Sequence, residues 1–156
     1  MNRRRLRFLR IAALFGLAAT AAAAAGRSDA AREHERKEVA GLAIVFGAEP
    51  EPALTDEVQF LRWRVTTLSD EQPYNDFADA QVTISRGGVQ FGPFALQRVR
   101  ATPGQYQTRH VFTEPGEYGS VLRFRKGADA QVHTIDFTFN INDRAEVEIP
   151  RSRGGP

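Results

Sequence analysis

Few residues of this chain belong to the types that bind metals or attack substrates. The sequence contains no cysteine, and its one methionine is Met1. Thiolate and thioether sulfurs select copper(I), so we expect no such site in the body of the chain. The remaining nitrogen ligands are His34, His110 and His133. With alternating strand directions, His110 and His133 are expected ~15–20 Å apart at ~3.3 Å per residue. We therefore favour core-edge or surface roles over a shared metal.

An acidic segment, SDEQPYNDFAD, is the best candidate for a hard metal ion. It supplies carboxylates from Asp70, Asp76 and Asp79, and calcium accepts many oxygen ligands. However, the EF-hand pattern with its glycine is absent, and acidic loops between strands are commonly solvated connections. These three residues, with His110 and His133, are therefore kept as metal candidates, while no metal or cofactor is predicted.

Catalytic motifs are also missing. There is no Gly-x-Ser-x-Gly elbow and no phosphate-binding loop. Ser69, Ser85 and Ser120 have no histidine and acid nearby in the sequence, although a triad assembled in space is not excluded by this. The prediction is that the protein is not an enzyme.

Arginine is frequent at alternating positions in the middle of the chain. One interpretation is a ligand face for acidic partners. The other, which we favour because acidic residues balance the charge, is that outward charges discourage edge-to-edge association. The residues concerned are Arg62, Arg64, Arg86, Arg98, Arg100, Arg109, Arg123 and Arg125.

Residues 1–25 have the composition of a helical secretory signal peptide. Five arginines precede an uncharged, alanine-rich run that ends at Ala23-Ala24-Ala25. The run is shorter than the ~20 residues that span a membrane, so we expect cleavage rather than an anchor. Without these residues the net charge of +2 becomes −3, which argues against nucleic acid as a partner. A periplasmic or secreted location is expected, with membrane contact only through an uncleaved signal.

The elements that must position any site are predicted to be strands. Residues 26–38 are interpreted as a charged flexible spacer and 144–156 as a disordered tail. Between 39 and 143, apolar residues alternate with period two, as half-buried strands do. Gly87-Gly88 and residues 126–129 indicate hairpins. The fold class is therefore all-β, an immunoglobulin- or fibronectin type III-like two-sheet sandwich of about seven strands. Strands are expected at 42–46, 61–65, 80–84, 89–94, 106–112, 118–124 and 135–141.

One phrase occurs twice, as Pro103-Gly104-Gln105-Tyr106 and as Pro115-Gly116-Glu117-Tyr118. In each copy proline and glycine form a reversal, and the tyrosine then enters a strand with its ring toward the core. The second copy has the form of a tyrosine corner, whose hydroxyl bonds to upstream backbone. The residues predicted to be structural are Trp63, as the core tryptophan, Tyr106, Gly116 and Tyr118.

Two segments, VQFLRWRVTTLSDEQPYNDFADAQVTISRGG and ATPGQYQTRHVFTEPGEYGSVLRFRKG, resemble YtkA-like secreted domains and their FixH-like relatives. The resemblance covers residues 39–143 and implies an immunoglobulin-like sandwich. Some relatives travel with metal-handling or copper-delivery systems.

The expected function is an exported, non-catalytic binding or accessory module of the cell envelope, with another envelope protein as partner. One alternative is an accessory of copper or iron transport that uses His110 or His133. A second alternative is a hydrolase.

Overall fold

Alternating burial explains how the longest strands pack. On β3 (Val58–Thr67), Leu61, Trp63 and Val65 are fully buried. Arg62 and Arg64, which lie between them, point away from the core. Since successive strand residues face opposite sides of a sheet, such a strand needs a second apolar layer on one side only. A two-layer structure follows.

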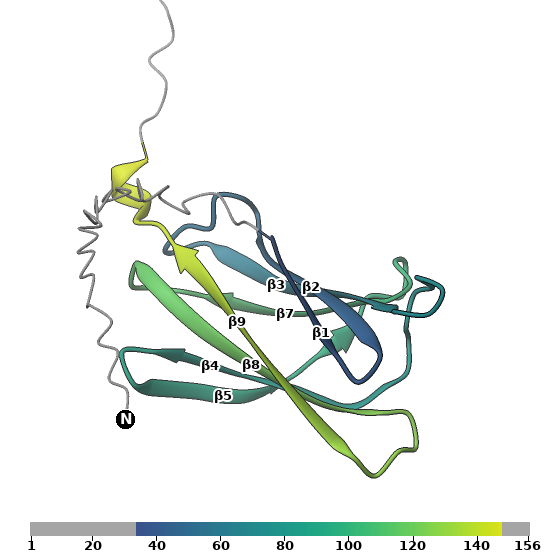
Figure 1. Ribbon diagram of the computed structural model, residues 1–156. Coiled ribbons are helices and arrows are strands. Elements are labelled where there is room, and N and C mark those ends of the chain that lie inside the picture. The colour runs from purple at the N-terminus through teal and green to yellow at the C-terminus, as the bar shows by residue number, and fades with distance from the viewer. Residues whose placement is uncertain (1–33, 148–156) are drawn as a thin grey trace, which may run out of the picture. The chain divides into compact units, whose positions relative to one another are not determined.

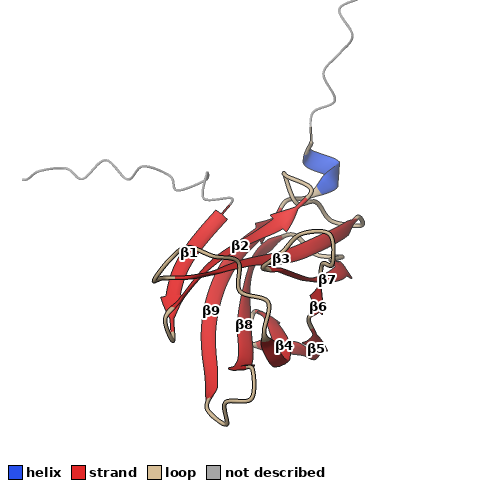
Figure 2. Ribbon diagram, turned by 90° about the vertical axis from the view of Figure 1, so that its right-hand side faces the viewer, coloured by secondary structure: helices blue, strands red, loops and turns tan. Residues whose placement is uncertain are grey.

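The computed structural model describes residues 34–147, and they form two antiparallel sheets packed as a sandwich (Figures 1 and 2). The five-stranded sheet has the order β1 (His34–Val39), β2 (Leu42–Glu49), β3, β7 (Gln105–Val111) and β6 (Gln97–Arg98). The four-stranded sheet has the order β5 (Val89–Ala95), β4 (Phe77–Arg86), β8 (Gly116–Lys126) and β9 (Val132–Ile141). A short 3-10 helix, η1 (Arg144–Glu146), follows β9.

The seven predicted strands are confirmed as β2, β3, β4, β5, β7, β8 and β9. Gly87 and Gly88 form the turn between β4 and β5, as predicted. No helix within residues 34–147 is long and apolar enough to cross a membrane.

Aromatic side chains join the two sheets. Phe46 of β2 lies 5.1 Å, between ring centroids, from both Trp63 of β3 and Phe137 of β9. Phe77 of β4 stacks on Tyr106 of β7 at 4.6 Å. Burying such side chains contributes about 1.5–3 kcal/mol each. In a chain with no cysteine, this packing takes the place of a covalent link between the sheets.

The two tyrosines of the repeated phrase are both buried and both bind backbone. The Tyr118 hydroxyl donates to the carbonyl oxygen of Glu114 at 2.8 Å, the hydrogen bond of a tyrosine corner. The Tyr106 hydroxyl instead accepts from the Phe77 N–H at 3.1 Å. Tyr106 therefore links β7 to the start of β4, whereas Tyr118 stabilises the turn that precedes its own strand, β8.

The spacer predicted for residues 26–38 is wrong over residues 34–38, because these residues belong to β1. Lys37 binds Asp136 of β9 at 3.1 Å, and Glu35 accepts from the N–H of Thr138 at 3.1 Å. The spacer was predicted because these residues have too little apolar surface to pack against the domain. β1 is held instead by main-chain bonds to β2 and by these polar contacts to β9.

The start of the predicted tail is also ordered. Asp143 caps η1 by accepting from the N–H of Ala145, and Arg144 binds Glu57 at 2.7 Å. The two-residue strand β6 was not predicted either. Residues 1–33, with the predicted signal peptide, and residues 148–156 lie outside the described part of the chain.

Candidate binding site on the outer face of the five-stranded sheet

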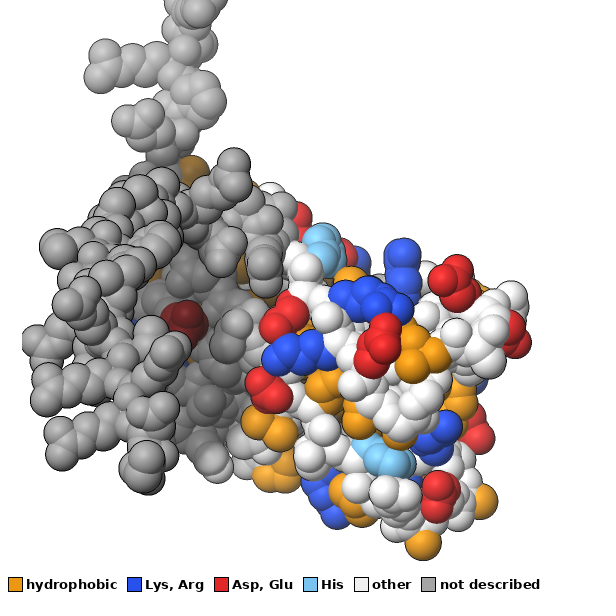
Figure 3. Space-filling view, viewed as in Figure 1, with side chains coloured by type: hydrophobic (Ala, Val, Ile, Leu, Met, Phe, Trp, Pro, Cys, Tyr) orange, Lys and Arg blue, Asp and Glu red, His pale blue; other side chains and the backbone are white. Residues whose placement is uncertain are grey.

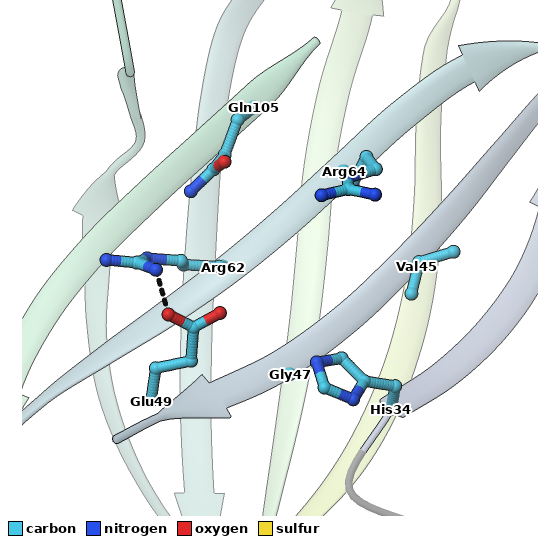
Figure 4. A pocket seen from close by; sticks show the side chains of 7 residues that line it. All are labelled: His34, Val45, Gly47, Glu49, Arg62, Arg64 and Gln105. Atoms are coloured by element: carbon cyan, nitrogen blue, oxygen red, sulfur yellow. Dashed lines mark hydrogen bonds and ion pairs between the residues drawn. The ribbon is translucent and has the colours of Figure 1, made fainter. Parts of the chain in front are cut away.

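The outer face of the five-stranded sheet carries a pocket of about 290 Å³. Strands β1, β2, β3 and β7 all contribute to it (Figure 4). Its lining residues point outward from their strands: His34, Val45, Gly47, Glu49, Arg62, Arg64 and Gln105.

Strand register places these residues side by side. Gly47 of β2 lies between His34 of β1 and Arg62 of β3. Two residues after Arg62 on β3, Arg64 lies between Val45 of β2 and Gln105 of β7. Because glycine has no side chain, the surface between the imidazole and the Arg62 guanidinium stays hollow.

Arg62 is held in place by two neighbours. It forms an ion pair with Glu49 (Figure 4), and its guanidinium carbon lies 5.3 Å from the ring centroid of Phe60. Its buried Nε has no hydrogen-bond partner within the described residues. Arg62 is thus oriented, and its charge is partly neutralised by Glu49.

Arg64 has no such partner. It is exposed and forms no ion pair with any residue in the range 34–147. It lies two residues from Arg62 on the same face, ~7 Å along the strand. A guanidinium presents a fork of N–H donors that matches a carboxylate. Within residues 34–147, the pocket therefore offers an unpaired guanidinium and the Gln105 amide to an acidic group.

The metal candidates His110 and His133 lie in different sheets. His110 of β7 is half-buried, with its ring 4.3 Å from that of Phe94 and its Nε2 3.1 Å from the Thr108 hydroxyl. Burial lowers the pKa of His110 below its ordinary value. His133 of β9 packs on Phe124, with ring centroids 5.6 Å apart.

The acidic candidates also have separate partners. Asp70 accepts a hydrogen bond from the Thr67 hydroxyl, which lowers the pKa of its carboxyl. Asp79 lies on β4, not in the loop as predicted, and forms an ion pair with Arg125. The backbone carbonyl of Asp76 accepts from Gly127 at 2.7 Å. Within residues 34–147, no three His, Asp or Glu side chains gather as a metal site requires.

The other arginines follow two patterns. Like Arg62, Arg86 and Arg125 form ion pairs, with Glu114 and Asp79 respectively. On the side of the molecule in Figure 3, cationic and anionic side chains are interspersed. This arrangement fits the solvent-face interpretation. Arg64 and Arg109, on the outer face of the five-stranded sheet, have no carboxylate partner among residues 34–147, and the same is true of Arg98, Arg100 and Arg123.

Sequence reasoning missed five of the seven residues that line this pocket: His34, Val45, Gly47, Glu49 and Gln105. His34 was assigned to the spacer, yet its Nδ1 lies 3.5 Å from a Glu51 carboxylate oxygen. In the sequence, the only sign of these residues is that each occupies an outward position on a strand. For His34 even this sign was missing, because β1 was not predicted.

We compared the chain with protein-family models, curated proteins and solved structures, and none gives a significant match.

Proposed function

We propose that this protein is an exported, non-catalytic binding or accessory module of the cell envelope. Its partner is another envelope protein, and the recognition surface is the outer-face pocket. The observation that carries the proposal is that Arg64, which has no ion-pair partner among residues 34–147, lies beside the anchored Arg62 at the hollow over Gly47. An acidic side chain or chain terminus is the group that this surface fits.

Strand order supports an immunoglobulin-like type of sandwich. Immunoglobulin domains place strands A, B, E and D in one sheet and C, F and G in the other, with C′ added beside C in variable domains. Reading β2, β3, β7 and β6 as A, B, E and D gives the observed order of one sheet, with β1 added outside it. Reading β5, β4, β8 and β9 as C′, C, F and G gives the other. The resemblance to YtkA-like domains, which rests on two sequence segments, implies a sandwich of this type.

The tyrosine corner agrees with this reading. Tyr118 is near the start of β8, the counterpart of strand F, and Ser120 follows where antibody domains have a cysteine. Trp63 lies on β3, the counterpart of strand B, whereas antibody domains carry their core tryptophan on strand C. Trp63 therefore fills the core from a different strand.

Export and the absence of catalysis rest on different arguments. The composition of residues 1–25 supports export to the periplasm or beyond. A nucleophile needs a base within hydrogen-bond reach and a group that orients the base. His110 contacts the Thr108 hydroxyl, but no carboxylate within residues 34–147 binds the imidazole. Buried Ser120 has no partner in that range.

Site-specific crosslinking in the cell envelope tests the proposal. A photoreactive amino acid at Gln105, on the pocket rim, should give one predominant crosslinked protein. Arg64→Glu should abolish that crosslink, because it places a carboxylate against the acidic group of the partner. Arg123→Glu, on the outer face of the other sheet, is the matched control and should leave it intact. Crosslinks that are unchanged in Arg64→Glu would refute the pocket as the recognition surface.

A further inference from the structure

Within residues 34–147, the part of β7 that extends beyond the end of β6 is an open sheet edge. The short strand β6 pairs only with Gln107 and Tyr106 of β7. The rest of β7, from Thr108 to Val111, has β3 on one side and no strand on the other.

The direction of the main-chain groups follows from the hydrogen bonds at the start of β7. The carbonyl oxygen of Gln105 accepts from the N–H of Val99, on the side away from β3. Main-chain groups alternate in direction along an antiparallel strand. The N–H and C=O groups of Gln107, Arg109 and Val111 therefore point the same way as those of Gln105. Beyond β6, those of Arg109 and Val111 meet no strand of residues 34–147.

The edges of the other sheet differ from this one. At β9, the N–H of Thr138 is bound by the carboxylate of Glu35 from β1. On β5, the pairing with β4 is shifted by one residue between Phe91 and Phe94, where Pro93 lacks an N–H. Bulges and edge prolines prevent strand addition. The described part of β7 has neither a proline nor a register shift.

A hollow of about 670 Å³ lies against this edge. Phe60 and Arg109 line it from the outer face of the five-stranded sheet, and Thr108 and His110 line it from the inner face. Phe94 of β5 forms the opposite wall. Since residues from both faces of β7 border the hollow, it lies in the plane of the sheet, where the next strand would run.

We infer that β7 binds an extended segment of a partner polypeptide, which adds as a strand beside Arg109 and Val111. Unpaired main-chain groups in strand geometry are complemented by another extended chain. The residue opposite His110 directs its side chain to the inner face, against the edge of the His110–Phe94 ring pair, so it is apolar. The residue opposite Arg109 lies on the outer face, so it is acidic, because Arg109 has no carboxylate partner among residues 34–147. This site is separate from the Arg64 pocket.

Peptide selection tests the inference directly. A library of random heptapeptides is panned against the purified protein, and the selected peptides are synthesised with blocked termini. We expect enrichment of an apolar residue next to Asp or Glu. In ¹⁵N-labelled protein, the amides of Arg109 and Val111 should shift and gain protection from hydrogen exchange. Failure to enrich a motif, or shifts confined to β5 or to the Arg64 pocket, would overturn the inference.

Variants provide the controls. Val111→Pro removes an N–H that faces away from β3, so the domain should still fold while peptide affinity falls about tenfold, as expected for loss of about 1.4 kcal/mol. Arg109→Glu should weaken binding of acidic peptides and restore binding when their Asp or Glu is replaced by Lys. Arg123→Glu should bind peptides like the parent protein. Binding that is unchanged in both Val111→Pro and Arg109→Glu contradicts the inference, and it leaves the crosslinking test of the Arg64 pocket unaffected.

Discussion

Gly104 offers the sharpest test of how the fold is held together. Its φ is +74°, and a Cβ at this position would lie 2.6 Å from the carbonyl oxygen of Val65. Gly88 has a similar φ of +84°, but a Cβ there would meet nothing within 4 Å. Alanine at either position incurs the cost of a left-handed conformation, about 1–2 kcal/mol. Only Gly104→Ala adds a collision with backbone.

The collision reaches several hydrogen bonds. The carbonyl oxygen of Val65 accepts from Tyr74 at 2.9 Å. The N–H of Gly104 donates to Asn75 Oδ1 at 2.7 Å, and its carbonyl accepts from Val65 at 2.8 Å. Any movement that relieves the clash lengthens these bonds, each of which contributes about 0.5–1.5 kcal/mol. We therefore expect a loss of about 3 kcal/mol for Gly104→Ala and about 1 kcal/mol for Gly88→Ala.

Thermal and denaturant unfolding of the two variants measure this difference. At about 4 °C per kcal/mol for a domain of this size, the melting temperature should fall by roughly 12 °C for Gly104→Ala and by about 4 °C for Gly88→Ala. Equal losses in the two variants would show that backbone conformation alone sets the cost. That result would contradict the close approach of Gly104 to the carbonyl oxygen of Val65 on β3.

Three further predictions concern side chains. Tyr118→Phe removes the hydrogen bond to Glu114 but keeps the ring, so the free energy of unfolding should fall by about 1 kcal/mol in denaturant titrations; no change would contradict a tyrosine corner. Because burial lowers the pKa of His110, the unfolded chain takes up a proton below about pH 6.5 before the folded protein does. Stability should therefore fall as pH decreases toward the folded pKa, and His110→Gln should make that fall shallower; an identical pH profile would refute burial as the cause. In a thermal-shift panel with copper, zinc, iron and calcium, we expect no rise in the melting temperature; a rise abolished by His110→Ala or His133→Ala would favour the metal-handling alternative.

Most of the strands that sequence patterns predicted have one buried face, whereas β5, predicted beside the Gly87-Gly88 turn, has no fully buried residue. Leu61, Trp63 and Val65 alternate with Arg62 and Arg64, and the structure buries the first set and exposes the second. The Pro-Gly phrases also predicted where β7 and β8 begin. In each case the signal is local, because a turn residue and a side-chain period of two act within a few neighbouring residues.

The strands that were missed are held by main-chain bonds and polar contacts. β1 is rich in charged residues and has no buried residue, and its Lys37 and Glu35 contact β9 across about a hundred residues of sequence. β6 has two exposed residues and no pattern to detect. β1 and β6 have no fully buried residue and lack the hydrophobic periodicity that predicts strands, whereas β5 also lacks a fully buried residue but follows the Gly87-Gly88 hairpin signal.

The candidate pocket was predictable only in part, for a related reason. Arg62 and Arg64 could be assigned to one outward face from their spacing. Their approach to His34 and Gln105 depends on the register of β1, β2, β3 and β7, which joins residues far apart in the sequence. Composition cannot supply that register, so the arginines could equally have been solvent-facing charge.

Within the part of the chain that the structure describes, the two proposed surfaces are the Arg64 pocket, which contains an unpaired arginine, and the part of β7 beyond β6, which is an open strand edge. Arg64 has no carboxylate partner among residues 34–147, and unlike Arg123, which also lacks one there, it borders a pocket. The edge of β5 is interrupted at Pro93 and one N–H of the β9 edge is bound by Glu35, whereas β7 beyond Gln107 meets no further strand of residues 34–147. An unpaired cation and an open strand edge each favour association. Local departures of this kind are expected at functional sites, because elsewhere nothing offsets their cost. The Arg64 pocket and the open part of β7 both lie on the five-stranded sheet, and for this reason both proposals place the partner on that sheet.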